Sequence, residues 1–278
     1  MNDYCYLNGT IVPVHEAKIS VYDIGITRGY GIYESIKTYR RKPFFLRQHL
    51  DRFRSSVKAT NLKIPVSDTE IAKIIDELVE KNGYPETNIR MILTGGQTLH
   101  GIEYDFDHPT FFILAEPNSQ IDKKFYEEGC TLMTFEHQRL YPAFKTTNYI
   151  TAVNLQPLRK EKGALEILYT WQGKILECAT SNFFLFQGDT LVTPKNNVLL
   201  GITRMAVIAS VASEFKVEER DVLIQEFDDA SEAFLTATYK EVVPVVRVDD
   251  KKIGNGTVGN RTKKVMELFR ECTEQVSL

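Results

Sequence analysis

The sequence predicts an α+β fold of two lobes, and three observations support this prediction. Strand and helix patterns alternate irregularly along the chain, without an internal repeat. Hairpin signals are frequent, whereas the strand-helix-strand spacing of a doubly wound parallel sheet is rare. A polar stretch at 116–125 interrupts the apolar periodicity and indicates a linker. We therefore expect a small N-terminal domain over 1–117, a linker over 118–124 and a larger domain over 125–278.

The predicted elements of the smaller domain depend mostly on turn and cap signals. Asn-Gly pairs favour tight hairpins, and a Ser with Glu three residues later begins helices. The expected elements are, in order, a hairpin over 4–14 around Asn8-Gly9, two strands over 31–46 joined at 40–42, a helix over 47–62, a helix over 71–81 between the Ser67/Glu70 capping box and Gly83, and strands at 87–96 and 110–117.

The larger domain is predicted to mix strands with shorter helices. Apolar runs with many β-branched and aromatic residues indicate strands, and apolar residues at helical spacing indicate helices. The expected elements are a strand at 129–135, a helix around 148–161, strands at 164–171 and 182–187, a helix after Gly201, one long strand at 232–248 and a helix at 261–272.

The composition is that of an ordinary globular chain. Of its 278 residues, 43% are apolar and 26% are charged, which excludes a disordered or fibrous protein. The net charge of -3 comes from 34 basic and 37 acidic side chains without long runs of one sign, which predicts small-molecule partners and no nucleic acid. No apolar stretch approaches the roughly 20 residues that span a bilayer, so we expect no membrane contact. Four widely spaced cysteines indicate free thiols and no metal site. We expect no signal segment and a cytoplasmic location.

A helix that begins at Gly201 offers a candidate anion site. The first amides of a helix lack partners within the helix, and its N-terminus carries a partial positive charge. The sequence "GITR" at 201–204 could therefore hold a phosphate, although a simple turn with Thr203 as the N-cap also fits. The small polar run 236–238 would likewise let backbone amides approach an anion.

Two charged residues stand in apolar surroundings. Lys145 follows Phe144 just before a predicted helix, where desolvation would lower the pKa of its amine and make it nucleophilic; the alternative is a solvated surface lysine. Glu177 lies in a predicted strand between Leu176 and Cys178, where its carboxylate needs a partner. That partner is either a ligand or a neighbouring basic side chain.

Five segments in order, HLDR (49–52), FKTTNY (144–149), ECATSNFFL (177–185), GITR (201–204) and TATYKEVVPV (236–245), resemble the class IV aminotransferases. These are pyridoxal 5'-phosphate enzymes of fold type IV, among them branched-chain and D-amino-acid aminotransferases and aminodeoxychorismate lyase. The resemblance covers nearly the whole chain. It implies a two-domain fold with the cofactor between the lobes and a homodimer in which a loop of the partner closes each site.

The resemblance also implies a role for each matching residue. Lys145 would form the Schiff base with the cofactor aldehyde and then move a proton at the substrate Cα. Glu177 would pair with the pyridine nitrogen, so that the ring can accept electrons. The remaining cofactor-binding positions are Arg52, Ile202, Thr203 and Thr238, which would hold the phosphate, and Leu199, which would lie against the ring.

The substrate pocket of the family includes the segment 28–39, where Tyr33 matches a pocket tyrosine. Typical D-amino-acid aminotransferases carry an Arg-x-His carboxylate trap just after the strand at 87–96, where this chain has two glycines. Branched-chain enzymes carry an arginine inside that strand, as Arg90 does here. Its apolar neighbours at 89 and 91–93 predict burial on both faces, so its charge needs an anionic partner. We expect Arg28 and Arg90 to bind substrate carboxylates, unless both pair with structural Asp or Glu side chains.

The segment 23–39 and the length of the chain resemble the D-specific enzymes more than the branched-chain ones. We therefore predict a D-amino-acid transaminase that acts on substrates such as D-glutamate or D-alanine with 2-oxoglutarate, by a ping-pong mechanism. The alternatives are a branched-chain L-amino-acid aminotransferase, an aminodeoxychorismate lyase, and a protein that binds the cofactor without turnover.

Overall fold

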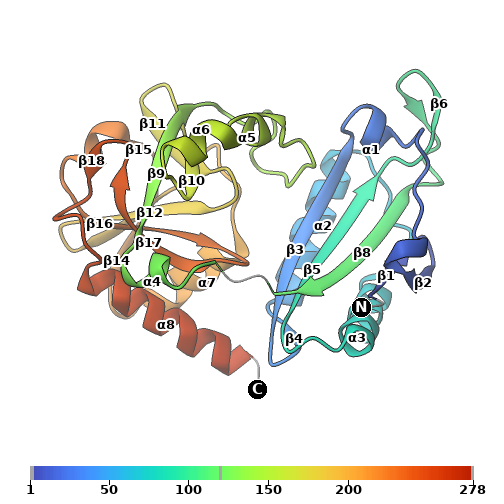
Figure 1. Cartoon of the computed structure of the whole chain (residues 1–278), viewed down its shortest axis with the longest axis horizontal. Helices are drawn as coiled ribbons and strands as arrows, with labels where there is room; N and C mark the ends of the chain where they lie inside the picture. Colours follow the sequence, from blue (N-terminus) through green and yellow to red (C-terminus); the bar gives the residue numbers. More distant parts are fainter. Residues whose placement is uncertain (1–2, 119–120, 277–278) are drawn as a thin grey trace. The chain divides into compact units, whose positions relative to one another are not determined.

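The computed structural model describes residues 3–118 and 121–276. It mixes helices with sheets, which confirms the predicted α+β class (Figure 1). Within the described residues the chain forms two compact units: the first contains residues up to 118 with 144–149 and 276, the second 121–143 and 150–275. Residues 144–149 thus belong to the first unit although they follow the predicted linker at 118–124. Residues 119 and 120 of that linker lie outside the described part, and the predicted domain boundaries stay a prediction.

The first unit is an antiparallel sheet of six strands in the order β2-β1-β8-β5-β3-β4, with two helices that share its core. Apolar side chains of α2 and α3, such as Phe53 and Ile75, pack with Ile32 and Ile89 of the sheet. The elements are β1 (Tyr4–Leu7), β2 (Thr10–Pro13), η1 (Val14–Glu16), α1 (Ile24–Thr27), β3 (Gly31–Tyr39), β4 (Lys42–Pro43), α2 (Leu46–Ala59), α3 (Asp68–Asn82), β5 (Thr87–Thr94), β6 (Thr98–His100), β7 (Glu103–Tyr104) and β8 (Thr110–Pro117).

The local signals of this unit are confirmed. Asn8 and Gly9 both have positive φ, at 45° and 103°, as a two-residue hairpin of the favoured hand requires. The Ser67 side chain accepts a hydrogen bond from the Glu70 amide, and the Glu70 carboxylate accepts one from the Ser67 amide, which completes the capping box. Gly83 ends α3 in the left-handed conformation.

Residues 144–149 extend the edge of β3. The Tyr33 amide donates to the Lys145 carbonyl at 2.8 Å, and the Thr147 amide donates to the Gly31 carbonyl at 2.9 Å. β4 pairs with β3 only at its far end, opposite 38–39, so the first half of this edge accepts the segment. Backbone pairing therefore places Lys145 beside a strand that precedes it by more than one hundred residues.

The second unit contains a ten-stranded sheet in the order β14-β13-β12-β16-β17-β9-β10-β11-β15, with β18 beside β17. Figure 1 shows α5 and α6 at one side of this unit and α4, α7 and α8 at the other. The elements are α4 (Lys124–Glu127), β9 (Cys130–Glu136), α5 (Ile150–Asn154), α6 (Gln156–Glu161), β10 (Glu166–Trp171), β11 (Lys174–Cys178), β12 (Asn182–Gln187), β13 (Thr190–Pro194), α7 (Ile202–Val211), β14 (Lys216–Arg220), β15 (Val222–Leu223), η2 (Ile224–Phe227), β16 (Ala230–Ala237), β17 (Glu241–Val248), β18 (Lys251–Lys252) and α8 (Asn260–Val276).

Two predicted elements of this unit are wrong. The long strand at 232–248 is a hairpin of β16 and β17, because the chain turns at 238–240 and Ala237 pairs with Glu241. Thr238 therefore lies in a turn and not within a strand. The helix predicted around 148–161 is two short helices, α5 and α6, that break at Leu155. Pro157 has no amide hydrogen to continue the helical ladder, so a new helix starts there.

Within 3–118 and 121–276, no helix is both long and apolar enough to cross a membrane. The same residues contain no group of three or more His, Cys, Asp or Glu side chains that could hold a metal ion.

Candidate functional site

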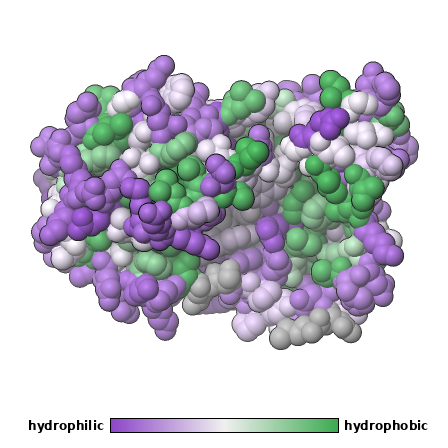
Figure 2. Space-filling model, turned by 45° about the horizontal axis from the view of Figure 1, so that its top comes forward, coloured by the Kyte–Doolittle hydropathy of each residue, from purple (hydrophilic) through white to green (hydrophobic). Residues whose placement is uncertain are grey.

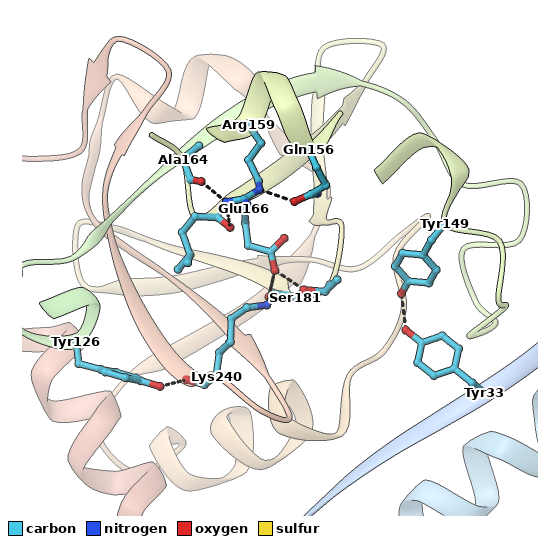
Figure 3. A network of polar contacts seen from close by, with 11 residues as sticks. Tyr33, Tyr126, Tyr149, Gln156, Arg159, Ala164, Glu166, Ser181 and Lys240 are labelled. Carbon is cyan, nitrogen blue, oxygen red and sulfur yellow. Dashed lines mark hydrogen bonds and ion pairs between the residues drawn. The ribbon is translucent and has the colours of Figure 1, made fainter. Parts of the chain in front are cut away.

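Lys145 lies in a small group of hydroxyls in the first unit. Its Nζ donates to the hydroxyl of Tyr33 at 2.8 Å and lies 4.1 Å from the centre of the Tyr33 ring. That hydroxyl lies 2.5 Å from the Tyr149 hydroxyl, and Figure 3 shows the two tyrosines facing each other. Because Lys145 is only half-buried, its amine remains within reach of a ligand. The structure thus joins two predicted site residues, Lys145 and Tyr33, and adds Tyr149, which the sequence analysis missed.

Arg52 takes part in a buried ionic network around Glu34, which follows Tyr33 in β3 and therefore points to the other face of the sheet. Its Nε and Nη2 donate to the two Glu34 carboxylate oxygens at 2.9 and 2.6 Å, and His49 Nδ1 lies 3.1 Å from the same carboxylate. Burial raises the pKa of Glu34, but Arg52 and His49 outweigh burial and hold that pKa well below its usual range. The sequence analysis did not single out Glu34 or His49. The signal for Glu34 was its charge within the mostly apolar strand 31–39, whereas His49 lies in α2 and had no such signal.

Glu177 of β11 has the partner that its position required. Arg139 Nε and Nη2 donate to Glu177 Oε1 at 2.9 and 2.6 Å, and the Leu199 amide donates to Oε2 at 3.0 Å. Both side chains are largely buried. The carboxylate and Leu199, both predicted cofactor-binding residues, are therefore in direct contact. Arg139 was missed because its partner is close only in the folded chain.

Helix α7 begins without a side-chain cap. Its N-cap is Gly201, not Thr203, and the part of the chain that the structure describes shows no side-chain cap hydrogen bond there. A Cβ at position 201 would overlap Asn182 Oδ1, and the Asn182 amide nitrogen donates to the Leu199 carbonyl at 2.6 Å. Ile202 and Thr203 are buried at the start of the helix. Glycine is required here because the Asn182 side chain packs directly against the backbone.

A buried hydroxyl beside this helix start is unsatisfied. Thr236 Oγ1 has no hydrogen-bond partner among the described residues, and Thr236 pairs with Asn182 across β16 and β12. Buried polar atoms in folded proteins nearly always have partners. Uncapped amides, an orphan hydroxyl and the Glu177 carboxylate are the groups that a phosphorylated pyridine needs, so the residues of the second unit fit pyridoxal phosphate.

The two arginines predicted to bind substrate differ in their surroundings. Arg90 donates through Nε to Glu116 at 2.9 Å and through Nη2 to the same oxygen, and both side chains are nearly half exposed. The expected burial of Arg90 on both faces is thus wrong, because only its β5 neighbours Met91 and Ile89 face the helices. Arg28 is exposed, and its Nη1 donates to the Thr27 carbonyl at 2.7 Å.

The register of β3 and β5 places Arg90 on the face that carries Tyr33. Ser35 pairs with Arg90 and Tyr33 pairs with Ile92, and residues two apart in a strand share a face. Such diagonal neighbours lie roughly 7–8 Å apart, within reach of long side chains. A substrate near Lys145 and Tyr33 could therefore meet the Arg90 guanidinium.

Comparisons with known proteins agree with this geometry. The family model described as amino-transferase class IV matches residues 31–248. A putative branched-chain-amino-acid aminotransferase of Methanocaldococcus jannaschii is 32% identical over 276 residues, which cover 96% of this chain and 95% of that protein. A D-alanine aminotransferase of Listeria monocytogenes is 27% identical, with 97% of this chain and 98% of that protein covered.

Two solved structures that are similar to this chain are aminotransferases too. The branched-chain amino acid aminotransferase of Escherichia coli superposes with a TM-score of 0.91 at 25% identity, covering 98% of this chain and 94% of that chain. A second branched-chain amino acid aminotransferase, that of T.th. with pyridoxamine 5'-phosphate, has a TM-score of 0.91 at 26% identity, covering 99% of this chain and 95% of that chain. The fold type implied by the five sequence segments is thereby confirmed.

Proposed function

Because the chain belongs to the class IV aminotransferases, which use pyridoxal 5'-phosphate, we propose that it transfers the amino group of a D-amino acid, of the D-glutamate or D-alanine type, to a 2-oxo acid such as 2-oxoglutarate. The single observation that carries the part of this proposal concerning acidic substrates is the diagonal relationship of Arg90 and Tyr33 on one face of the first sheet. The similarity to D-alanine aminotransferases of Listeria supports it.

Arg90 is able to exchange its protein partner for a substrate carboxylate. Ion pairs between half-exposed side chains contribute only about 0–1 kcal/mol, so the Glu116 carboxylate holds Arg90 weakly. A second carboxylate group on the substrate would give the exposed Arg28 a partner as well. We propose that the two guanidinium groups select acidic amino acids.

Lys145 would supply the base at the substrate Cα. Its amine is held by the Tyr33 hydroxyl, which fixes the direction in which it takes and returns a proton. When bound, pyridoxal phosphate supplies an aldehyde and an electron-accepting ring. We propose ping-pong kinetics, in which the 2-oxo acid product leaves before the second substrate binds.

Glu177 and the start of α7 would hold the cofactor. Arg139 and the Leu199 amide hold the Glu177 carboxylate in place, and a carboxylate beside the ring nitrogen would keep that nitrogen protonated. The amides of Ile202 and Thr203 and the group at Thr238 would take the phosphate. The resemblance assigns the same role to Arg52, whose guanidinium binds Glu34 within the first unit.

A branched-chain L-amino-acid aminotransferase is the second candidate. The similarity to the Methanocaldococcus jannaschii protein and to the two solved branched-chain enzymes favours it. An arginine within β5, at position 90, fits this candidate too. The side of the cofactor from which the α-carboxylate is bound decides between the two candidates.

The absorbance spectrum of the purified protein distinguishes the D-amino-acid function from the branched-chain function. We expect the cofactor band to shift to that of the aminated form on addition of D-glutamate and not of L-leucine. A shift with L-leucine or L-glutamate alone would favour the branched-chain function. A band that responds to none of the three would contradict both, and no band after added pyridoxal phosphate would contradict the role of Lys145.

We also propose a homodimer. Figure 2 shows apolar side chains gathered on the surface of the first unit, more than isolated surface residues would give. The large apolar side chains of this unit that are at least half exposed are Val21, Tyr22, Ile26, Leu99, Ile102 and Phe106. Sedimentation at several concentrations tests the assembly. The cytoplasmic location stays a prediction.

A further inference from the structure

Three donors converge on one carboxylate oxygen inside the second unit. Glu166 Oε1 accepts hydrogen bonds from Lys240 Nζ at 2.5 Å, from Ser181 Oγ at 2.9 Å and from Thr180 Oγ1. Lys240 Nζ also donates to Thr180 Oγ1 at 2.6 Å. Glu166 is 4% exposed, and Figure 3 shows Lys240 and Ser181 directed at its carboxylate. No step of the proposed reaction uses these groups.

Glu166 is ionised although it is buried. Burial raises the pKa of Glu166, but the Lys240 ammonium and the two hydroxyls outweigh burial and bring that pKa below its usual value. A buried ion pair adds little stability compared with an apolar pair of the same size, because both charges lose their hydration. What such a pair does provide is a fixed geometry for the segments that carry it.

One of these segments is the turn 238–240, which contains Thr238. Lys240 is held there at two points, because its carbonyl accepts from the Tyr126 hydroxyl at 3.0 Å while its ammonium reaches Glu166. The next residue, Glu241, has φ 59°, a left-handed conformation that non-glycine residues rarely adopt. Strained backbone of this kind persists where the surrounding contacts hold it. The Lys240 contacts therefore define the shape of the turn.

The other segment is the loop 179–181, which joins β11 to β12. Thr180 and Ser181 bind Glu166 through their side chains, and the Ser181 carbonyl accepts from the Cys178 amide at 2.8 Å. Directly after the loop, Asn182 supports the Leu199 carbonyl just before α7. One ion pair thus ties the turn that carries Thr238 to the loop that leads to Asn182.

We propose that Lys240 and Glu166 are positioning residues for the cofactor phosphate. They act through the turn 238–240 and the loop 179–181, which hold Thr238 and the start of α7 in register. Neither side chain needs to touch the phosphate. This inference rests on the proposed function, in which Thr238 and the α7 amides bind that phosphate.

The test compares pyridoxal 5'-phosphate with pyridoxal, which lacks the phosphate. Dissociation constants for both are measured by equilibrium dialysis and absorbance with the full chain. The variants are Lys240→Met, Glu166→Gln and the double variant Lys240→Met/Glu166→Leu, which leaves no unpaired charge if a single variant folds poorly. Lys174→Met is the matched control, because Lys174 pairs with Asp221 at 2.6 Å elsewhere in the same unit.

We expect all three variants to bind pyridoxal 5'-phosphate about tenfold more weakly, comparable to the loss seen when the partner that orients a metal ligand is removed. Pyridoxal binding and the control should be unchanged, since a general loss of stability would affect both ligands. Equal weakening of both ligands, or wild-type binding by the double variant, would overturn the inference. If the wild type itself does not prefer the phosphorylated ligand, the proposed phosphate site fails, and the inference fails with it.

Discussion

The Lys145 amine lies 2.8 Å from the Tyr33 hydroxyl and 4.1 Å from the centre of the Tyr33 ring, although the two residues are 112 positions apart. The hydroxyl can orient the amine, and the ring face lies close enough to contact it. Tyr149 adds a second hydroxyl at 2.5 Å from the first. A defined direction for proton transfer is therefore present in the first unit.

Replacing Tyr33 by phenylalanine should reduce kcat by about tenfold or more, because general acid–base steps depend on the alignment of the base. The ring is retained, so the cofactor should remain bound. Stopped-flow absorbance of the first half-reaction measures the effect. Tyr104→Phe is the control, since its hydroxyl donates to the Asn61 carbonyl in the same unit. An unchanged rate would mean that Tyr33 only fills space.

Replacing Arg90 by alanine should raise KM for the amino acid with little change in cofactor content. A lost charge-assisted hydrogen bond costs about 1.5–3 kcal/mol, which corresponds to about a 10–100-fold rise. Glu116→Gln should leave KM the same or lower it, because Arg90 loses a competing partner. Arg41→Ala, which removes an exposed pair with Glu80, is the control. Unchanged kinetics for Arg90→Ala would assign it a structural role only.

The buried His49 should make stability depend on pH. Burial lowers the pKa of His49 below 6.5, in spite of Glu34, while Arg52 and Lys145 lower it further. The unfolded chain then binds a proton that the folded chain does not, so the free energy of unfolding falls as pH drops below about 6.5. The depressed pKa of Glu34 acts in the same direction at lower pH, below its ordinary 4.5.

Urea unfolding from about pH 7.5 to about 5.5 measures this dependence. His49→Gln should flatten the curve, because the amide can still donate to Glu34 but does not titrate. The partly buried His137, whose pKa burial also lowers, stays in both proteins and cancels in the comparison. His15→Gln, at an exposed position, should leave the slope unchanged. Equal slopes for wild type and His49→Gln would contradict the prediction.

Local signals were sufficient to predict much of the fold. The Asn8-Gly9 turn, the Ser67 capping box and the Gly83 stop each depend on a few adjacent residues, and each is confirmed. The hairpin at 230–248 was missed because its turn contains no glycine and places Glu241 at φ 59°. Without a glycine or Asn-Gly pair, a continuous strand was the simpler prediction.

The site residues also fall into two groups: those that local sequence could identify and those that only the fold brings to the site. Lys145, Glu177 and the Gly201 helix start could be named from their neighbours in sequence and from the family resemblance. Their partners could not be named, because each comes from a distant segment of the chain. Arg139 binds Glu177, Glu34 binds Arg52, and Tyr149 meets Tyr33. For Arg90 the sequence suggested burial, but the polar face of the sheet leaves it half exposed beside Glu116. Its proposed role in binding a substrate carboxylate depends on this exposure.

Gly201→Ala tests the start of α7 directly. The backbone at 201, with φ -67°, suits alanine, so only the overlap of the new Cβ with Asn182 Oδ1 opposes the change. Asn182 cannot move away without losing its hydrogen bond to the Leu199 carbonyl. We expect a loss of about 1–3 kcal/mol in unfolding free energy, as for other overpacked sites, and weaker binding of pyridoxal 5'-phosphate. Asn182→Ala added to Gly201→Ala removes the overlap and should restore stability more than cofactor affinity, since Leu199 then lacks its support. Unweakened cofactor binding by Gly201→Ala would place the phosphate away from α7.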